Sequence, residues 1–316
     1  MERTERLDPG SGGVERAAEL LAAGRLVAFP TETVYGLGAD ARSGEAVGRI
    51  FEAKERPRFN PLIVHVATRA AAMALADIPP MALLLAEAHW PGPLTLVAPL
   101  KPGSGLSELV TAGLDTVAVR VPSHAVAHRL LTEFGGPVAA PSANRSGRIS
   151  PTRAEHVLAS LDGRIAAVLD AGPTEVGLES TIVGVDGARP VLLRPGGLSV
   201  DEIATTLGRP LSYRLGGPVN APGQLDRHYA PSARLRLGAR EPEEGEAWLG
   251  FGPGTPPAGG PHCNLSESGD LREAAANLFA HLHALDAEAG RIAVAPIPEE
   301  GLGQAINDRL RRAATR

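Results

Sequence analysis

Apolar and polar positions along residues 14–210 form two patterns, short continuous apolar runs and longer amphipathic segments. The amphipathic segment 14–23 predicts a helix that ends at Gly24, a residue suited to a left-handed cap. Thr152 and Ser199 are each followed three residues later by glutamate, the spacing of a capping box, and predict two further helix starts. Strands are predicted for the β-rich runs 26–29, 63–66, 94–98 and 117–121. Alternating strands and helices indicate an α/β layer structure with helices packed on a sheet.

The chain changes character after residue 211. Residues 212–233 are rich in glycine and proline, which predicts a linker. Beyond it, strands are predicted at 234–237, 247–251 and 292–294, and helices at 271–285 and 302–313. We therefore expect a first domain over residues 1–211, a linker over residues 212–233 and a small second α/β domain over residues 234–316.

Composition narrows the classes of protein and site. The net charge of −5 argues against a nucleic-acid-binding surface of large area. Apolar segments are too short to span a bilayer, and the charged N-terminus lacks the apolar part of a signal peptide, so we expect a cytoplasmic protein. The single cysteine, Cys263, excludes an internal disulfide and points to a reducing compartment. It stands in a Gly/Pro-rich loop without a basic partner, which predicts an inert thiol.

Two segments carry the candidate chemistry. Lys54, Arg56 and Arg58 concentrate positive charge directly before an apolar, strand-like run, and Lys54 is notable because the chain has only one other lysine, Lys101. Downstream, Ser142-Ala143-Asn144-Arg145-Ser146-Gly147 supplies hydroxyl and amide groups next to glycine. Together the two segments predict a site for a polyanion such as a nucleoside triphosphate. The alternative is that the cations are solvated surface charges.

Other patterns are too incomplete to define a site. Gly36-x-Gly38-x-x-Ala41 matches a dinucleotide fingerprint but lies away from the tight strand-to-helix turn, and no acidic residue follows at the required distance. The chain has no Gly-Lys pair of a P-loop. His124 and His128 stand four residues apart without a third ligand, so we expect no metal site. Ser142 and Ser180 lack the context of a nucleophile elbow.

The two candidate segments belong to an ordered set of motifs that resembles the YrdC/Sua5 family, the L-threonylcarbamoyladenylate synthases. The segment from Ala221 to Pro231 resembles the linker of the long, Sua5-type members, although Gln224-Leu225-Asp226 replaces the Met-x-Tyr stretch that many members carry there. The resemblance therefore extends over nearly the whole chain. The motifs are Pro30-Thr31-Glu32-Thr33-Val34-Tyr35-Gly36-Leu37, Lys54-x-Arg56, Trp90-Pro91-Gly92-Pro93-Leu94-Thr95, Val119-Arg120-Val121-Pro122, Ser142-x-Asn144, Glu179-Ser180-Thr181-Ile182 and Arg194-Pro195-Gly196.

The resemblance implies a twisted mixed sheet covered by helices and a small Rossmann-like C-terminal α/β domain. It implies a nucleotidyltransferase that converts L-threonine, bicarbonate or CO2, and ATP to threonylcarbamoyl-AMP and pyrophosphate. A downstream tRNA threonylcarbamoyl-transfer complex would use the product to modify adenosine 37 of tRNA, with weak direct tRNA binding and no membrane. Mg2+ would be carried on the phosphates of ATP rather than on protein ligands.

The resemblance also assigns roles to residues. Lys54 and Arg56 are the expected catalytic cations, and Arg120 would pair with the threonine carboxylate. A lone histidine in an apolar strand is usually structural, so His65 becomes a threonine contact through the resemblance alone. No general base is assigned. The expected threonine-binding residues are Thr33, His65, Arg120, Ala140 and Ser180, and the expected nucleotide-binding residues are Arg56, Asn60, Thr116, Ser142, Asn144, Ser150, Arg194 and Tyr229.

The linker combines stiff turn residues with His228 and Tyr229, two groups able to touch a ligand. We hypothesise that residues 221–231 fold over the nucleotide site as a lid, with Tyr229 reaching the phosphates.

Two other functions are considered: an RNA-binding protein of the same fold without synthase activity, and a carbamoyltransferase related to a domain of a hydrogenase maturation factor. The chain lacks the acylphosphatase and zinc-finger patterns of that factor.

Overall fold

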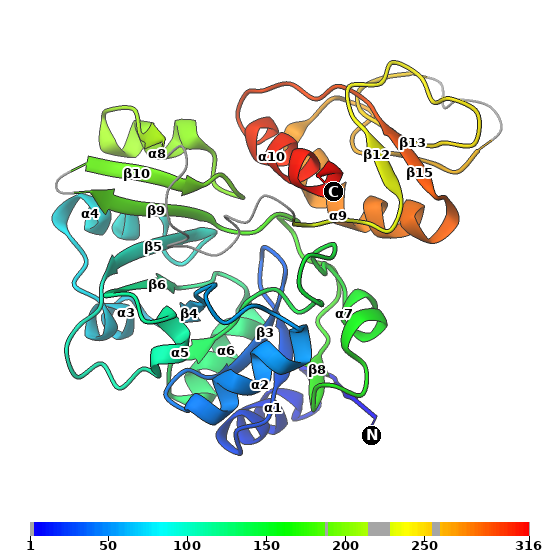
Figure 1. Cartoon of the computed structure of the whole chain (residues 1–316). Helices are drawn as coiled ribbons and strands as arrows, with labels where there is room; N and C mark the ends of the chain where they lie inside the picture. The colour runs from blue at the N-terminus through cyan, green and yellow to red at the C-terminus, as the bar shows by residue number, and fades with distance from the viewer. Residues whose placement is uncertain (1–2, 187–188, 214–227, 255–259, 316) are drawn as a thin grey trace.

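The computed structural model describes residues 3–186, 189–213, 228–254 and 260–315, which form two α/β domains (Figure 1). In the first domain the described strands form one mixed sheet in the order β1-β8-β2-β3-β7-β4-β6-β5-β9-β10-β11. β4 and β6 are parallel, whereas β5 and β6 are antiparallel, so the predicted mixed sheet is confirmed. The strands are β1 Glu5–Leu7, β2 Val27–Pro30, β3 Tyr35–Asp40, β4 Ile63–His65, β5 Leu94–Pro99, β6 Thr116–Arg120, β7 Val138–Ala139, β8 Ala167–Leu169, β9 Thr181–Asp186, β10 Arg189–Arg194 and β11 Ser212–Tyr213.

Local sequence explains where several helices begin and end. The first predicted helix is confirmed, and Gly24 follows it with φ 70°. Ser43 caps α2 through a hydrogen bond from the Ala46 amide at 3.1 Å. Ser199 and Glu202 form the predicted capping box of α8. The helices of this domain are α1 Gly13–Ala22, α2 Gly44–Lys54, α3 Arg69–Leu75, α4 Pro80–His89, α5 Glu108–Thr111, α6 Ala125–Phe134, α7 Ala154–Leu161 and α8 Val200–Leu207.

For the other predicted helix start, the helix is present but the predicted capping residue is wrong. α7 begins at Ala154, and Arg153 occupies the N-cap position without a side-chain cap bond. The Thr152 hydroxyl lies 3.4 Å from Nδ1 of His156 instead. A threonine hydroxyl can bond to a nearby side chain as readily as to a backbone amide, so the Thr-x-x-Glu spacing alone does not decide the cap.

One further local expectation changes. Cys263 lies in a strand, β14 His262–Asn264, rather than in a loop. His124 is the N-cap of α6, where its Nδ1 accepts a hydrogen bond from the Val126 amide at 3.2 Å. The imidazole therefore caps the helix, and His128 lies one turn further along it. Among the residues that the structure describes, no group of three His, Cys, Asp or Glu side chains could hold a metal ion. No helix in the described ranges has the length and apolarity to cross a membrane.

Apolar side chains pack on both faces of the large sheet. α1 and α6 cover one face, where Leu21 and Leu130 pack with Phe29 of β2. The other face carries the larger cluster, with Ile50 of α2 and Leu85 of α4 at its centre. Successive residues of a strand point to opposite faces, which explains why neighbouring residues of β2 belong to different clusters.

The second domain is a four-stranded parallel sheet in the order β12-β15-β13-β14, covered by two helices. These helices lie on the side that faces the first domain (Figure 1). The elements are β12 Arg234–Arg236, β13 Ala247–Gly250, β14 His262–Asn264, α9 Leu271–Glu288, β15 Arg291–Val294 and α10 Gly303–Ala314. This arrangement confirms the predicted small C-terminal α/β domain.

The two domains share part of one hydrophobic core. Val34, Ile149 and Leu178 of the first domain belong to the same buried cluster as the apolar face of α9. Gly177 of the first domain packs directly against α9, because a Cβ atom placed on it would lie 2.4 Å from the Ala275 carbonyl oxygen. Of the predicted linker, residues 212–213 form β11 beside β10, and residues 214–227 lie outside the described ranges. The domain boundaries remain a prediction.

Candidate active site

A small pocket of about 50 Å3 lies among the turn after β2, strands β4 and β6, the segment 140–142, and residues 228–229. It brings together many of the residues predicted from the sequence: Thr33, Arg56, His65, Arg120, Ala140, Ser142, Ser180, Arg194 and Tyr229. The other predicted site residues do not line it: Lys54, Asn60, Thr116, Asn144 and Ser150.

Arg120 is buried at the end of β6 and is held by the turn after β2. Its Nη1 donates to Thr33 Oγ1 at 2.8 Å, and its Nη2 lies 2.7 Å from Glu32 Oε1. The side chains of Arg120 and Glu32 are only 4% and 5% exposed. A guanidinium fixed in this way can present its remaining donors to a carboxylate in a defined orientation.

His65, the last residue of β4, lies beside Arg120 in the same pocket. Burial and the positive charge of Arg120 lower the pKa of His65 to about 3. The imidazole is therefore neutral at neutral pH, and its Nδ1 has no protein partner among the described residues. A neutral ring can accept a hydrogen bond from an ammonium or hydroxyl group of a ligand.

Two more buried arginines line the pocket. Arg56 donates from Nη2 to the Pro61 carbonyl oxygen at 3.0 Å, while its Nε has no partner among the described residues. Burial lowers the pKa of Arg56 to about 10, so the group stays charged at neutral pH. Arg194 donates from Nη2 to the Ser180 carbonyl oxygen at 2.8 Å. These cations make the pocket suited to an anionic ligand.

Lys54 holds a loop at the edge of the pocket. It is the last residue of α2 and is 1% exposed. Its Nζ donates to the carbonyl oxygen of Ser142 at 2.6 Å and also to that of Asn144. Burial and the charge of Arg56 hold the pKa of Lys54 well below its ordinary value. In this arrangement Lys54 fixes the backbone of the Ser-x-Asn motif.

The remaining predicted nucleotide-binding residues differ in their surroundings. Asn144 donates from Nδ2 to the Arg148 carbonyl oxygen at 2.8 Å, which closes the loop that Lys54 holds. Ser150 donates its hydroxyl to Glu179 Oε1. Thr116 is half-buried at the start of β6, opposite Pro99 of β5. The structure thus links Asn144 and Ser150 to groups around the pocket through hydrogen bonds, and among the described residues Thr116 has no such link.

Buried polar atoms without a protein partner gather at this place. Within the described ranges they include Nε of Arg56, both amide atoms of Asn60, Nδ1 of His65 and of His228, and the Tyr229 hydroxyl. Nearly all buried polar groups in folded proteins are hydrogen-bonded, so such a concentration is typical of a binding site for a ligand or ordered water.

His228 and Tyr229 reach the pocket from the second domain's side of the chain. Tyr229 is fully buried, has φ 64°, and stacks on Phe279 of α9 with 5.7 Å between ring centroids. The Ala230 amide donates to the Gly147 carbonyl oxygen at 2.8 Å. Of the predicted lid, residues 221–227 lie outside the described ranges, so the contacts that can be stated are those of residues 228–231.

Sequence reasoning assigned no role to three charged residues of this region. Glu32 and Glu179 both stood inside motifs, and Glu32 is one of the polar residues that follow the end of the first predicted strand. Arg309 of α10 gave no local signal, since the amphipathic pattern of that helix is typical of a surface helix with basic residues.

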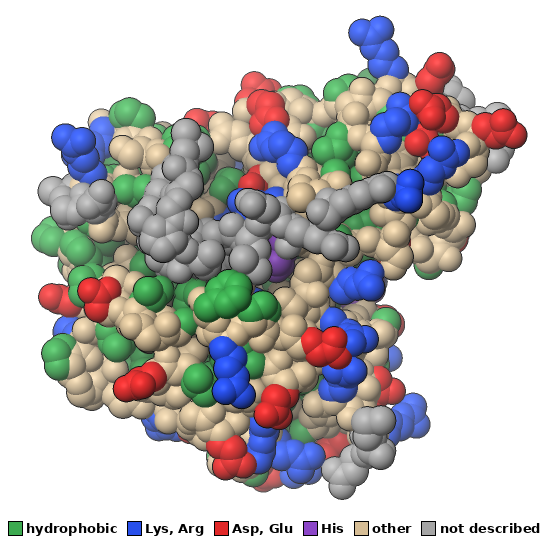
Figure 2. Space-filling model, in the orientation of Figure 1, with side chains coloured by type: hydrophobic (Ala, Val, Ile, Leu, Met, Phe, Trp, Pro, Cys, Tyr) green, Lys and Arg blue, Asp and Glu red, His purple; other side chains and the backbone are tan. Residues whose placement is uncertain are grey.

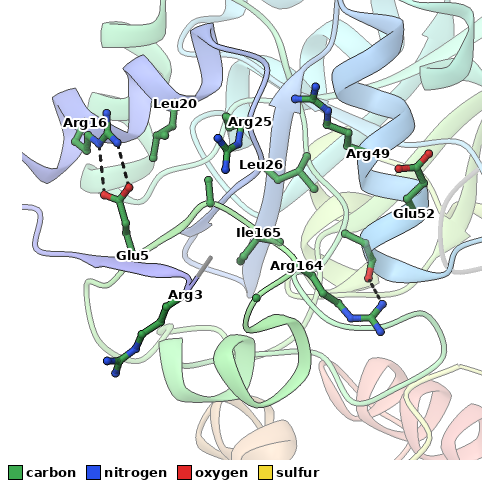
Figure 3. Close-up of a pocket in the computed structure, with 13 residues that line it drawn as sticks. Arg3, Glu5, Arg16, Leu20, Arg25, Leu26, Arg49, Glu52, Arg164 and Ile165 are labelled. Carbon is green, nitrogen blue, oxygen red and sulfur yellow. Dashed lines mark hydrogen bonds and ion pairs between the residues drawn. The ribbon is translucent and has the colours of Figure 1, made fainter. Parts of the chain in front are cut away.

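A larger hollow of about 1130 Å3 lies elsewhere, between α1, α2 and the segment 163–166 (Figure 3). Arg16 in its wall pairs with Glu5 at 3.0 Å, and Arg164 pairs with Glu55 at 2.9 Å. No aromatic residue is among the described residues that line it, so it does not form a stacking platform for nucleic acid. Its arginines are Arg3, Arg16, Arg25, Arg49 and Arg164.

Comparison with protein families divides the chain into two matched regions. A family model described as "Telomere recombination" (Sua5_yciO_yrdC) matches residues 19–196. A second model, described as "Threonylcarbamoyl-AMP synthase, C-terminal domain", matches residues 198–315. The second match thus includes α8, which the sequence analysis assigned to the first domain.

Individual relatives with known names match this chain over almost its whole length and theirs. The threonylcarbamoyl-AMP synthase of Bacillus subtilis is 42% identical, covering 98% of this chain and 95% of its own, and that of Pyrococcus abyssi is 43% identical, covering 94% and 93%. The crystal structure of P. abyssi Sua5 complexed with L-threonine superposes with a TM-score of 0.89 at 38% identity, over 98% of this chain and 97% of that one. The chain therefore belongs to the Sua5-type threonylcarbamoyl-AMP synthases, with a YrdC-type domain followed by a Sua5 C-terminal domain.

Proposed function

We propose that the pocket lined by Arg56, His65, Arg120 and Arg194 is the site at which this chain makes threonylcarbamoyl-AMP from L-threonine, bicarbonate and ATP. One observation carries the proposal. The pocket combines a buried arginine fixed by Glu32, which suits a carboxylate, with two further buried arginines that suit phosphates. A site for a plain nucleotide would need no second, separately fixed carboxylate-binding arginine.

Threonine would bind at the Arg120 end of the pocket. Its carboxylate would pair with the Arg120 guanidinium, and its amine or hydroxyl would donate to the neutral ring of His65. Thr33, Ala140 and Ser180 would complete the walls of this subsite. The L-threonine complex of the P. abyssi relative supports a threonine site in proteins of this fold.

The chemistry needs positioning and charge stabilisation more than covalent help. The threonine amine and bicarbonate form a carbamate with loss of water. A carbamate oxygen then attacks the α-phosphorus of ATP, and the bond to the β-phosphate oxygen breaks to release pyrophosphate. Arg56 and Arg194 would stabilise the charge on the phosphoryl and pyrophosphate oxygens, and Lys54 would hold the Ser142–Asn144 backbone against the nucleotide.

Mg2+ would accompany the nucleotide. Of the nearby carboxylates, Glu32 is engaged by Arg120, and Glu179 by Ser150 and Arg309. The donor set of this site therefore suits a cation carried by phosphate oxygens and water better than one held by protein ligands. The ion would supply charge neutralisation at the phosphates, while the arginines orient the same groups.

Tyr229 would act as the described part of a lid. It lines the pocket together with Arg56 and Arg194, and its hydroxyl has no protein partner in the described ranges. The pocket volume of about 50 Å3 is far below the roughly 300 Å3 or more of ordinary ligand sites, so we expect a wall of the pocket to move when the nucleotide enters. The structure of a P. abyssi Sua5 variant in which an adjacent histidine and tyrosine are replaced by alanine superposes on this chain with a TM-score of 0.88.

We propose that the product passes in the cytoplasm to a tRNA threonylcarbamoyl-transfer complex. The RNA-binding alternative receives no support from the visible surface, where acidic and basic side chains are interspersed rather than gathered by sign (Figure 2). The likeness to a hydrogenase maturation factor, HypF, at 19% identity, shows a shared fold alone.

The test is pyrophosphate release from ATP with purified full-length protein. We expect release to require L-threonine and bicarbonate together, with threonylcarbamoyl-AMP as the second product. Equal ATP turnover without threonine would contradict the proposal and indicate a nucleotidase. Release without bicarbonate in CO2-free buffer would show that the amino acid is adenylated directly.

A further inference from the structure

Arg309 of α10 is the largest fully buried side chain that the structure describes, and it points from the second domain toward the pocket of the first. Its Nε donates to Glu179 Oε2 at 2.8 Å, and its Nη1 donates to Asp308 Oδ2 at 2.6 Å. Its guanidinium carbon lies 4.9 Å from the centroid of the Tyr229 ring. One side chain thus touches a carboxylate and an aromatic ring that both line the pocket.

Glu179 connects Arg309 to the site. Its second oxygen accepts the hydroxyl hydrogen of Ser150, and its backbone oxygen accepts from the Gly197 amide at 2.9 Å. A Cβ atom on Gly196 would lie 2.3 Å from this same backbone oxygen, so the backbones of residues 179 and 196 pack closely. With the backbone held by these contacts, the direction of the carboxylate depends on its two side-chain partners.

The second domain is linked to Ser150 in two ways, one direct and one indirect. Nε2 of His283 in α9 lies 3.2 Å from the Ser150 carbonyl oxygen, and Arg309 of α10 is linked to the Ser150 hydroxyl through the Glu179 carboxylate. Both α9 and α10 are therefore connected to a residue assigned to the nucleotide. Electrostatics agrees with the geometry, because burial raises the pKa of Glu179 but the charges of Arg309 and Arg194 outweigh it and keep the carboxylate ionised.

We infer that Arg309 is a positioning residue for the synthase site, contributed by the C-terminal domain, which holds Glu179, Ser150 and the Tyr229 ring in the arrangement that receives ATP. This inference rests on the proposed function of the pocket. It gives the C-terminal domain a part in the first step, although none of its strands or helices carries a residue that lines the pocket.

The test compares Arg309→Ala, Arg309→Lys and the double variant Arg309→Ala/Glu179→Gln in the full-length protein. We expect Arg309→Ala to raise the KM for ATP and lower kcat, with a combined loss in kcat/KM of at least about thirtyfold, while threonine binding by calorimetry changes less than about threefold. Arg309→Lys should recover part of the loss. The double variant should be more active than Arg309→Ala, because it removes the unpaired buried carboxylate while glutamine still accepts from Ser150.

A pH profile separates positioning from a general loss of structure. Glu179 faces Arg309 from α10, Arg194 from β10, and the hydroxyls of Ser150 and Tyr229. Without Arg309 its pKa should rise, so the acid limb of kcat/KM for ATP should move to higher pH by at least about half a unit. Glu179→Gln on the same background should abolish this movement.

Arg311→Ala is the matched control, because Arg311 lies on the same helix, is 57% exposed and pairs with Glu299 at 2.7 Å on the surface of the second domain. It should keep wild-type kinetics. Wild-type kinetics in Arg309→Ala, or a double variant no more active than Arg309→Ala, would overturn the inference. If the wild-type protein itself releases no pyrophosphate with threonine and bicarbonate, the proposed function fails instead. If Arg309→Ala does not fold, the kinetics of Arg309→Lys and of the double variant decide, and wild-type kinetics in both would overturn the inference.

Discussion

His156 and His283 stack ring on ring across the boundary between the two domains, with 3.9 Å between centroids and 23° between ring planes. His156 belongs to α7 and His283 to α9. Burial and the neighbouring charges of His283 and Arg153 lower the pKa of His156 to about 3. Protonation of His156 is therefore unfavourable in the folded chain, which makes the domain contact sensitive to acid.

The first prediction is a loss of stability on acidification. The unfolded chain binds a proton at His156 below about pH 6.5, whereas the folded chain does so only near pH 3, so stability falls as the pH drops through this window. Allowing for partial exposure, we expect up to about 1 kcal/mol per pH unit from this group. Urea unfolding at pH 7.5 and 5.5 should show a smaller difference in His156→Gln than in wild type. The exposed His128→Gln serves as the control and should leave the difference unchanged.

The second prediction concerns Arg120. Arg120→Ala should weaken threonine binding by roughly ten- to a hundredfold, because charged hydrogen bonds contribute about 1.5–3 kcal/mol. Arg120→Lys keeps the charge but loses the planar fork, so it should recover only part of the affinity. Calorimetric titration with L-threonine measures both. Unchanged threonine affinity in Arg120→Ala would place the carboxylate elsewhere. Glu32→Gln on the Ala background controls for the unpaired buried carboxylate.

The third prediction separates two cations that are close in sequence. Arg56→Ala should lower kcat by about a hundred- to a thousandfold, corresponding to about 2.7–4 kcal/mol of lost transition-state stabilisation. Lys54→Ala should also lose most activity, but with a lower melting temperature, since the carbonyls of Ser142 and Asn144 lose their shared donor. Arg58 is exposed, and Arg58→Ala should be close to wild type. Steady-state pyrophosphate release and thermal unfolding distinguish the three.

The fourth prediction tests Tyr229. The Tyr229 hydroxyl has no protein partner in the described ranges, so Tyr229→Phe should leave the free energy of unfolding within about 0.5 kcal/mol of wild type. If the hydroxyl reaches the phosphates, the same variant should raise the KM for ATP severalfold. Unchanged ATP kinetics together with unchanged stability would mean that the ring only fills space against Phe279 and Arg309.

The fifth prediction uses two glycines with similar backbones. Gly177 and Gly172 have φ 73° and 81°, so alanine is strained at both, by about 1–2 kcal/mol. Only at Gly177 would the added methyl group collide with α9, at 2.4 Å from Ala275 O. Gly177→Ala should therefore be less stable than Gly172→Ala by at least about 1 kcal/mol in urea unfolding. Equal stabilities would show that the domain contact adapts at low cost.

Part of the fold was predictable, because β2, β4, β5 and β6 are continuous apolar runs and α1 is amphipathic, whereas helices α2–α6 and strands β7–β11 were not identified. β3 was not identified, since Gly36 and Gly38 interrupt its pattern; they permit close approach to Phe29 instead. β1 was also missed, because Glu5 and Arg6 are polar edge residues whose strand forms only by pairing with β8. Such elements depend on tertiary pairing, which local periodicity does not contain.

The site residues likewise include some that the motifs indicate and some that depend on tertiary contacts. Motif order brought Arg56, His65 and Arg120 to attention, and the structure gathers them in one pocket. Thr116 lies on the expected strand, but it does not line that pocket. Arg309 could not be predicted, because its importance comes from a partner 130 residues away and a basic residue on an amphipathic helix is ordinary. Long-range ion pairs leave no spacing in the sequence.

The Glu179–Arg309 pair has a consequence for the order in which the protein is made. Domains generally fold during synthesis, with the N-terminal one first, so the first domain can assemble its sheet while the second is still being translated. At that stage Glu179 lacks its arginine, and Val34, Ile149 and Leu178 lack their cover from α9. A nascent chain would therefore hold every predicted threonine-binding residue before α10 exists, and a ribosome stalled before residue 303 would present an immature enzyme to chaperones.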